Sequence, residues 1–202
     1  MGINLIFETP ADTQAQAVAQ YDQAMDLLGL RKTPAAGGIS HCAGPIPGGW
    51  RVCDVWESQA QFDAFMGGRL VPVLLKVGIP QPVITIYPVV KFYKASQLTA
   101  VQGTVQKTAV NAVFEIPGGT QAQYEQTLQL LGIDKKPQKG QISHAGGPMP
   151  GGWRVVDTWE SKDVMDAFFK ERLGAVLHQI GWQPIPRFYP VHRYLLASEV
   201  SN

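Results

Sequence analysis

The chain contains the stretch HCAGPIPGGWRVCDVWES at residues 41–58, and it contains a close copy, HAGGPMPGGWRVVDTWES, at residues 144–161. In both copies a Gly/Pro block separates two runs of strand-forming residues, which is typical of a β-hairpin. The second run ends at a Ser, whose hydroxyl can accept a backbone N–H at the start of a helix. Each stretch therefore predicts a hairpin that is followed at once by a helix.

The similarity between the two copies extends over most of the chain. Trp50 and Trp153 are 103 positions apart, and the same shift aligns the helical patterns on both sides of the hairpin. Near the start of each copy the shift becomes 107, because the first copy has four extra residues, about one helical turn. We therefore predict two domains, 1–96 and 108–202, joined by a polar linker at 97–107.

Each copy contains the same order of predicted elements. A short apolar run opens it, a helix with a Thr-x-x-Gln capping signal follows, and the hairpin leads into a second helix and a last strand. Both helices have apolar residues three and four positions apart and end at a glycine. The first copy gives 4–8, 13–28, 41–56, 58–77 and 83–94, and the second gives 109–116, 120–131, 144–159, 161–180 and 185–196.

This βαββαβ order is that of the ferredoxin-like sandwich, in which two helices cover one face of a four-stranded antiparallel sheet. The fold class is therefore predicted to be α+β, with two such repeats in tandem. Residues at both odd and even positions along the strands are largely apolar, which indicates that both faces of each sheet are buried. We expect the two repeats to pack sheet against sheet within one chain.

Three motifs of the second copy resemble a known family: the stretch at 144–161, Phe168-Phe169-x-x-Arg172-Leu173, and Phe188-Tyr-Pro-Val-His192. With their counterparts they make nearly the whole chain similar to two fused copies of the dimeric α+β barrel superfamily, which includes antibiotic-biosynthesis-monooxygenase-like proteins. The resemblance implies that the two sheets pair into an intramolecular α+β barrel. It implies no single reaction, because the superfamily includes cofactor-free oxygenases, lyases, cyclases and haem-degrading enzymes.

The haem-degrading members of this superfamily have a histidine in a helix that follows the hairpin tryptophan. The matching zones around Met66 and Phe169 contain none. We therefore expect no haem, and no other cofactor is implied by the sequence.

The composition excludes several classes of function. The formal net charge is +1 and no cluster of Lys and Arg occurs, so no nucleic-acid partner is expected. No apolar run approaches the roughly 18 residues of a membrane span, and the first residues have no signal-peptide pattern. We expect a cytoplasmic protein with no membrane partner. Cys42 and Cys53 have Ala145 and Val156 as counterparts, which favours packing over a disulfide or a reactive thiol.

His144 and its twin His41 are the strongest candidates for chemistry. His144 lies beside the Gly/Pro turn, and either Asp157 or Arg154 on the partner strand shares its face, depending on the hairpin register. A histidine beside a carboxylate can act as a general base near neutral pH. The alternative is that the imidazole braces the turn through a backbone carbonyl.

Asp54 and Asp157 interrupt apolar strands, so their carboxylates need partners. The expected ion-pair partners are Arg69 and Arg172 of the second helices, or Arg51 and Arg154 of the hairpin strands. Trp153, Trp159 and Arg154, with His41 and Asp54, are predicted to bind substrate, and the alternative for the tryptophans is a place in the core.

His192 has Val90 as its counterpart, so the second copy alone has an additional histidine on its last strand. We therefore predict that His144, Asp157 and His192 form the catalytic group and that the second repeat carries the working pocket. No metal site is predicted, because no further Cys, Glu or His stands at ligand spacing.

These observations predict a small-molecule enzyme that needs no cofactor, a monooxygenase, isomerase or lyase, acting on a small apolar or aromatic substrate. The alternative is a protein that binds or senses such a molecule without turnover. Because the fused repeats supply both halves of a pseudo-dimer, we expect a monomer, with a homodimer as the alternative.

Overall fold

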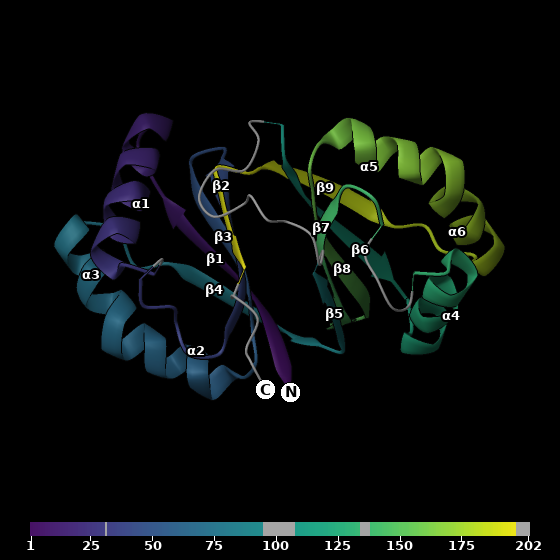
Figure 1. The fold of residues 1–202 in the computed structure, drawn as a ribbon, viewed down its shortest axis with the longest axis horizontal. Helices are drawn as coiled ribbons and strands as arrows, with labels where there is room; N and C mark the ends of the chain where they lie inside the picture. Colours follow the sequence, from purple (N-terminus) through teal and green to yellow (C-terminus); the bar gives the residue numbers. More distant parts are fainter. Residues whose placement is uncertain (31, 95–107, 134–137, 197–202) are drawn as a thin grey trace. The chain divides into compact units, whose positions relative to one another are not determined.

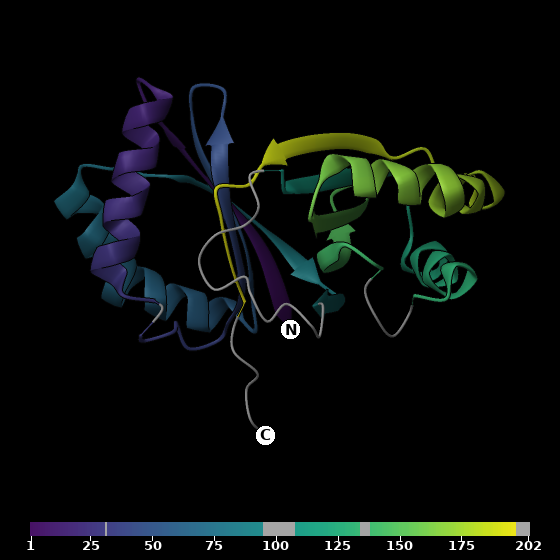
Figure 2. The same cartoon turned by 45° about the horizontal axis from the view of Figure 1, so that its top comes forward.

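The computed structural model describes residues 1–30, 32–94, 108–133 and 138–196, so the predicted linker at 97–107 lies outside the described residues. The described chain divides into two compact units. In each unit the helices cover one face of a sheet (Figures 1 and 2). Unit 1 contains residues 1–30, 32–86 and 191–196, and unit 2 contains residues 87–94, 108–133 and 138–190.

Unit 1 has a five-stranded antiparallel sheet in the order β10-β2-β3-β1-β4. Its strands are β1 (Gly2–Pro10), β2 (Gly38–Ile46), β3 (Gly49–Trp56), β4 (Val83–Val89, whose last three residues fall in unit 2) and β10 (Arg193–Leu196). Its helices are α1 (Gln14–Leu28), α2 (Gln59–Phe65), the π-helical segment η1 (Met66–Leu70) and α3 (Val71–Val77).

Unit 2 repeats this arrangement with a sheet in the order β5-β7-β8-β6-β9. Its strands are β5 (Lys91–Lys94), β6 (Val110–Pro117), β7 (Gln141–Met149), β8 (Gly152–Trp159) and β9 (Ile185–Pro190). Its helices are α4 (Gln121–Leu131), α5 (Lys162–Phe168), the π-helical segment η2 (Phe169–Leu173) and α6 (Gly174–Ile180). The element order confirms the predicted tandem ferredoxin-like fold.

Each predicted last strand is divided into two strands that belong to different sheets. β5 follows β4 in the chain but pairs with β7, and β10 follows β9 but pairs with β2. Pro88 and Pro190 stand just before the two breaks, and proline lacks the N–H that continues a ladder. Each sheet thus contains a fifth strand from the other repeat.

The expectation of a closed barrel is wrong for the described residues. Strand pairing stays within two open sheets, one with β10 and β4 at its edges and the other with β5 and β9. The division of the last strands extends each sheet by one strand and leaves two edges on each.

The helix boundaries follow the predicted capping signals. The hydroxyls of Thr13, Ser58 and Ser161 each accept the backbone N–H three residues later, and Thr120 forms a complete capping box with Gln123. The helices α1, α3, α4 and α6 each end at a glycine in the left-handed conformation: Gly29, Gly78, Gly132 and Gly181.

The second helix of each repeat contains a π-helical segment in place of the predicted uninterrupted α-helix. Arg69 lies in η1 and donates from Nη2 to Leu28 O at 2.7 Å, at the C-terminal end of α1. Arg172, in η2, donates in the same way to Leu131 O at the end of α4. Both arginines satisfy helix-end carbonyls, so the prediction that they pair with Asp54 and Asp157 is wrong.

Each unit has its own apolar core between the sheet and the helices. Trp50 and Trp56 belong to the core of unit 1, and Trp153 and Trp159 belong to the core of unit 2. Among the helices of the described ranges, none is both long enough and apolar enough to span a membrane.

Gly147 of β7 marks a close approach of two backbones in unit 2. A Cβ atom at this position would lie 1.9 Å from Pro88 O, a contact that only a backbone shift can relieve. We expect Gly147→Ala to lower the free energy of unfolding by about 1–3 kcal/mol, the usual cost of overpacking. Urea unfolding followed by tryptophan fluorescence measures the change. Gly67→Ala is the matched control, because a Cβ atom there meets nothing within 4 Å. Equal stabilities of the two variants would contradict the close packing of Gly147.

Candidate functional site

The hairpin register decides which residue faces each candidate histidine. In unit 1, His41 of β2 is directly opposite Asp54 of β3, and in unit 2, His144 of β7 is directly opposite Asp157 of β8. The sequence left open that Arg154 faces His144. The register excludes this alternative, because Arg154 is directly opposite Gly147.

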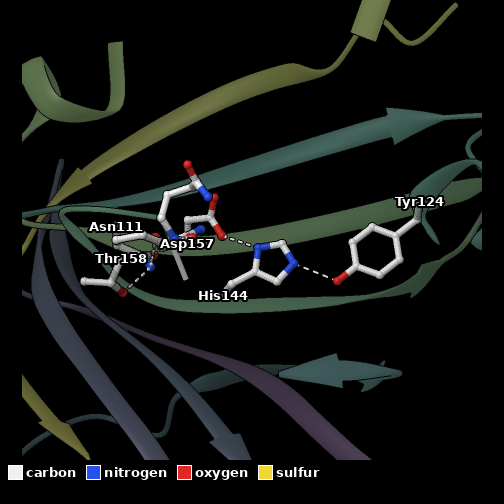
Figure 3. A network of polar contacts seen from close by, with 7 residues as sticks. Asn111, Tyr124, His144, Asp157 and Thr158 are labelled. Carbon is white, nitrogen blue, oxygen red and sulfur yellow. Dashed lines mark hydrogen bonds and ion pairs between the residues drawn. The ribbon is translucent and has the colours of Figure 1, made fainter. Parts of the chain in front are cut away.

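A series of three polar side chains crosses the interior of unit 2 (Figure 3). His144 Nδ1 lies 2.7 Å from Asp157 Oδ1, and His144 Nε2 lies 2.6 Å from the hydroxyl of Tyr124 on α4. All three side chains are buried. The series therefore connects the helix layer to both strands of the hairpin.

Unit 1 contains the same series on its equivalent residues. His41 Nδ1 lies 2.8 Å from Asp54 Oδ1, and His41 Nε2 lies 2.7 Å from the hydroxyl of Tyr21 on α1. The rings of Tyr21 and His41 are stacked, with an interplanar angle of 5°. Unlike their counterparts, His41 and Asp54 are partly accessible, with side-chain exposures of 17% and 13%.

An asparagine on the neighbouring strand holds the aspartate strand in both units. Asn111 Nδ2 donates to Asp157 O at 3.0 Å and to Thr158 Oγ1 at 3.4 Å, as Figure 3 shows. Asn4 Nδ2 donates to Asp54 O at 2.9 Å. Each series is thus anchored by a third strand.

The contacts assign the protons along each series. A carboxylate can only accept, so the nitrogen that faces it, Nδ1, carries a proton. In the neutral imidazole Nε2 is then an acceptor, and the tyrosine hydroxyl donates to it. Burial raises the pKa of Tyr21 well above its usual value, although Arg193 opposes this shift, and burial likewise raises the pKa of Tyr124. Both phenols are therefore neutral donors at physiological pH.

The two series differ in the space beside them. In unit 1 the residues Tyr21, His41 and Asp54 line a partly open cavity of about 210 Å³, whose wall is otherwise mostly apolar. In unit 2 the residues Tyr124, His144 and Asp157 line a cavity of only about 60 Å³. The larger cavity lies in unit 1, contrary to the prediction that the second repeat carries the working pocket.

His192 does not belong to the same unit as His144 and Asp157. His192 lies in unit 1, where its backbone N–H donates to Ala43 O and its Nε2 lies 3.0 Å from Asp22 Oδ1. The division of the last strand explains the difference, because the chain beyond Pro190 joins the sheet of unit 1. The expected grouping of these three residues in the second repeat is therefore wrong.

Arg193 follows His192 and contacts the same carboxylate. Its Nη2 donates to Asp22 Oδ1 at 2.8 Å, and its guanidinium carbon lies 5.5 Å from the centre of the Tyr21 ring. The ring of His192 meets the edges of Tyr21 and Trp50. Asp22, His192 and Arg193 are not among the residues that line the cavity of unit 1.

The other predicted substrate-binding residues of the second repeat lie away from its cavity. Trp153 and Trp159 are only 2% and 1% exposed and pack in the core of unit 2. Arg154 is buried with its guanidinium carbon 4.3 Å from the centre of the Tyr87 ring. In unit 1, by contrast, both predicted residues, His41 and Asp54, line the cavity.

The expected ion pairs of the aspartates are also different. The histidines, not the arginines, face Asp54 and Asp157. Arg51 lies instead 3.4 Å from Glu8, through its Nε. A carboxylate that accepts from a neutral imidazole satisfies the same need for a polar partner that the arginines were predicted to meet.

Sequence reasoning missed the two tyrosines and the two asparagines. Tyr21 and Tyr124 occupy equivalent positions in the two repeats, but their spacing alone places them on the apolar face of a helix. Both repeats have a tyrosine at this position, whereas other apolar positions of the helix differ between the repeats. This identity is the signal by which Tyr21 and Tyr124 could have been found. Asn4 and Asn111 carry the same signal within apolar strands.

The residues of the unit 1 cavity do not favour haem binding. Among the described residues that line it, His41 is the one His or Cys side chain, and both of its ring nitrogens already have partners. In the described part of the chain no three His, Cys, Asp or Glu side chains gather closely enough to hold a metal ion.

Together, the two units establish the ferredoxin-like fold that the hairpin motif indicated. Solved structures with this fold cover nearly the whole chain. The sequence itself matches no family model and no curated protein.

Three of these structures illustrate the likeness. A candidate monooxygenase from Fusobacterium nucleatum has 9% identity and a TM-score of 0.68, with 98% of this chain and 95% of that chain covered. A candidate monooxygenase from Lactobacillus acidophilus has 10% identity and a TM-score of 0.66, with coverage of 95% and 93%. An anthrone oxidase-like protein has 15% identity and a TM-score of 0.50, with coverage of 98% and 94%. At these identities the likeness shows the fold.

The raised pKa values of Tyr21 and Tyr124 predict how stability changes at high pH. Below about pH 10 both tyrosines are protonated in the folded and the unfolded chain, so their contribution is constant. Above about pH 10 only the unfolded chain loses these protons, so the free energy of unfolding falls as pH rises. We expect Tyr21 and Tyr124 to ionise only on unfolding, as measured by tyrosinate absorbance. Tyr21→Phe with Tyr124→Phe should remove the tyrosinate absorbance that appears only on unfolding and leave the alkaline titration of the folded protein unchanged. A smaller folded-state titration in this variant would contradict the assignment.

Proposed function

We propose that the protein is a small-molecule enzyme that binds a small apolar or aromatic substrate in the cavity of unit 1. The observation that carries the proposal is the position of a Tyr–His–Asp series in the wall of a mostly apolar cavity. A ligand site of this kind combines an apolar lining with a few converging polar groups. Tyr21, His41 and Asp54 are those polar groups.

The size of the cavity limits the substrate. An apolar protein cavity of about 150 Å³ is large enough to bind benzene. The unit 1 cavity, at about 210 Å³, is larger and partly open, so it suits a molecule of one or two rings. The cavity of about 60 Å³ in unit 2 is well below that size.

The series supports proton transfer to and from the substrate. An acidic O–H or C–H of the substrate gives its proton to the Tyr21 oxygen while the Tyr21 proton moves to His41 Nε2. The resulting imidazolium keeps its Nδ1–H on Asp54, whose negative charge stabilises it. No free tyrosinate forms, which matters because burial makes ionisation of Tyr21 unfavourable.

The deprotonated substrate then determines the reaction. Reprotonation at another atom is isomerisation, expulsion of a leaving group is a lyase reaction, and reaction with O₂ is oxygenation. The candidate monooxygenases and the anthrone oxidase-like protein that share the fold support the last of these. We therefore propose an oxygenase that needs no cofactor, with O₂ as the second substrate.

The proposal predicts that a panel of hydroxyaromatic compounds contains a substrate whose addition quenches the fluorescence of Trp50 and Trp56 at the cavity wall and starts oxygen uptake. Tyr21→Phe removes the hydroxyl through which the proton passes. We expect it to lower kcat by about 10²–10⁴-fold, the usual contribution of general acid–base catalysis, and to leave binding nearly unchanged. Steady-state oxygen uptake measures kcat, and the fluorescence titration measures binding.

Tyr124→Phe is the matched control, because it makes the same change in the unit with the small cavity. It should keep turnover. Loss of turnover in Tyr124→Phe with full activity in Tyr21→Phe would transfer the catalytic role to His144 and Asp157. Binding without consumption of any compound or of oxygen would make the protein a binding or sensing protein and contradict the proposed enzyme.

A further inference from the structure

We infer that side chains at equivalent positions of the two repeats decide which Tyr–His–Asp series a ligand can reach, so that the chain binds one small aromatic molecule, in unit 1. The series of unit 2 is then a structural site whose cavity is too small for the ligand, because its own side chains occupy the space. This inference rests on the proposed ligand cavity of unit 1 and does not depend on turnover.

The first of these positions follows the second helix. Ile79 N donates to Leu74 O at 3.0 Å, and Trp182 N donates to Leu177 O at 2.9 Å, so the two backbones have the same local geometry. Both side chains line the cavity of their unit, but Trp182 is 7% exposed and supplies an indole where Ile79 supplies four carbons. The larger ring occupies volume that remains open in unit 1.

The second position is the start of the first hairpin strand. Gly38 N donates to Ala35 O at 3.0 Å, and Gln141 N donates to Gln138 O at 2.9 Å, which again shows equivalent backbones. Gln141 is buried and lines the unit 2 cavity, and its Oε1 accepts the N–H of Gln138 at 3.0 Å. This hydrogen bond holds the Gln141 amide in the cavity of unit 2, where it occupies space. Gly38 has no side chain that could occupy the equivalent space in unit 1.

The third position faces the histidine itself. Leu195 of β10 is directly opposite His41, and Tyr93 of β5 is directly opposite His144. The Tyr93 and His144 rings lie 5.6 Å apart, so Tyr93 covers the imidazole with an aromatic ring. Leu195 instead forms part of the cavity wall. The division of the last strands places these residues, because each comes from the other repeat.

One exchange runs in the opposite direction. Leu5, which lines the unit 1 cavity, is equivalent to Ala112, since they stand opposite Asp54 and Asp157 in the same register. This change alone would enlarge the space in unit 2. The cavity of unit 2 is nevertheless smaller, so the larger side chains at the other positions more than offset it.

The first experiment closes the unit 1 cavity with the side chains of unit 2. The probe is 1-naphthol, and equilibrium dialysis gives both its affinity and the number bound per chain. The unmodified protein should bind one molecule. Ile79→Trp with Gly38→Gln should weaken binding at least tenfold, because the added side chains occupy the site. A Cβ atom at Gly38 would lie 3.3 Å from Ala35 O, a tight contact that needs a small backbone shift, so urea unfolding is used to confirm that the double variant is folded.

Leu75→Trp is the control for the added tryptophan, because Leu75 is 76% exposed and lies outside the cavity. It should bind 1-naphthol as the unmodified protein does. Equal weakening by Leu75→Trp would contradict a specific blockade of the cavity, and so would unchanged binding by the double variant.

The second experiment opens unit 2. Trp182→Ile with Gln141→Gly should raise the number of 1-naphthol molecules bound from one to two. Because removal of a buried ring lowers stability, Trp182→Leu alone is a milder second variant, and urea unfolding confirms that either variant is folded. If both variants are folded and still bind one molecule, the closure of unit 2 is not set by these side chains.

The remaining outcomes separate this inference from the proposed enzyme. Two molecules bound to the unmodified protein, or none, would overturn the inference whatever the result for turnover. One molecule bound in unit 1, with no compound consumed, would support it while contradicting the proposed enzyme.

Discussion

A series of contacting tyrosine, histidine and aspartate side chains connects the layers of each unit. Tyr124 belongs to the helix layer, His144 and Asp157 belong to the two strands of the hairpin, and Asn111 adds a third strand. Each buried polar group that loses its partner costs about 1–3 kcal/mol, so the four residues constrain the position of the helix on the sheet. The apolar residues supply most of the favourable burial, but these polar contacts require one arrangement of the helix and hairpin.

The Tyr–His–Asp series can act on a ligand only where a cavity lies beside it. In unit 1 the series lies at the wall of a cavity, and His41 and Asp54 are partly accessible. In unit 2 the equivalent groups are more deeply buried and serve the fold. The candidate catalytic series of unit 1 and the structural series of unit 2 thus have the same residue types and nearly the same interatomic distances. The side chains around each series decide which of the two roles it has.

The sequence predicted the fold well because the repeat, the capping signals and the hairpin are local patterns. Thr120, Ser161 and the terminal glycines of the helices act within a few residues of themselves, so their roles can be predicted without tertiary structure. The division of the last strands was missed, because strand-forming residues stand on both sides of each break. Periodicity also does not encode which strand each part pairs with. That error misplaced His192, and with it the predicted pocket.

Only the local part of the candidate site was predicted from the sequence. The two His–Asp pairs follow from a single hairpin, and only their register was open. Tyr21 comes from a helix twenty residues earlier in the chain, and on that helix a phenol whose hydroxyl meets a histidine cannot be distinguished by spacing from one that only fills the core. The size of the unit 1 cavity depends on Ile79, Gly38 and Leu195 together, and no local pattern relates these residues to one another.

The most direct test of the account is a ¹⁵N NMR measurement of the protonation of the two ring nitrogens of His41 and His144 at neutral pH. A carboxylate at Nδ1 and a neutral phenol at Nε2 predict that Nδ1 carries the proton and that Nε2 is an unprotonated acceptor in both residues. Tyr21→Phe and Tyr124→Phe should each shift the Nε2 signal of one histidine and so assign it. A proton on Nε2, with Nδ1 unprotonated, would contradict the series on which both the fold and the proposed chemistry depend.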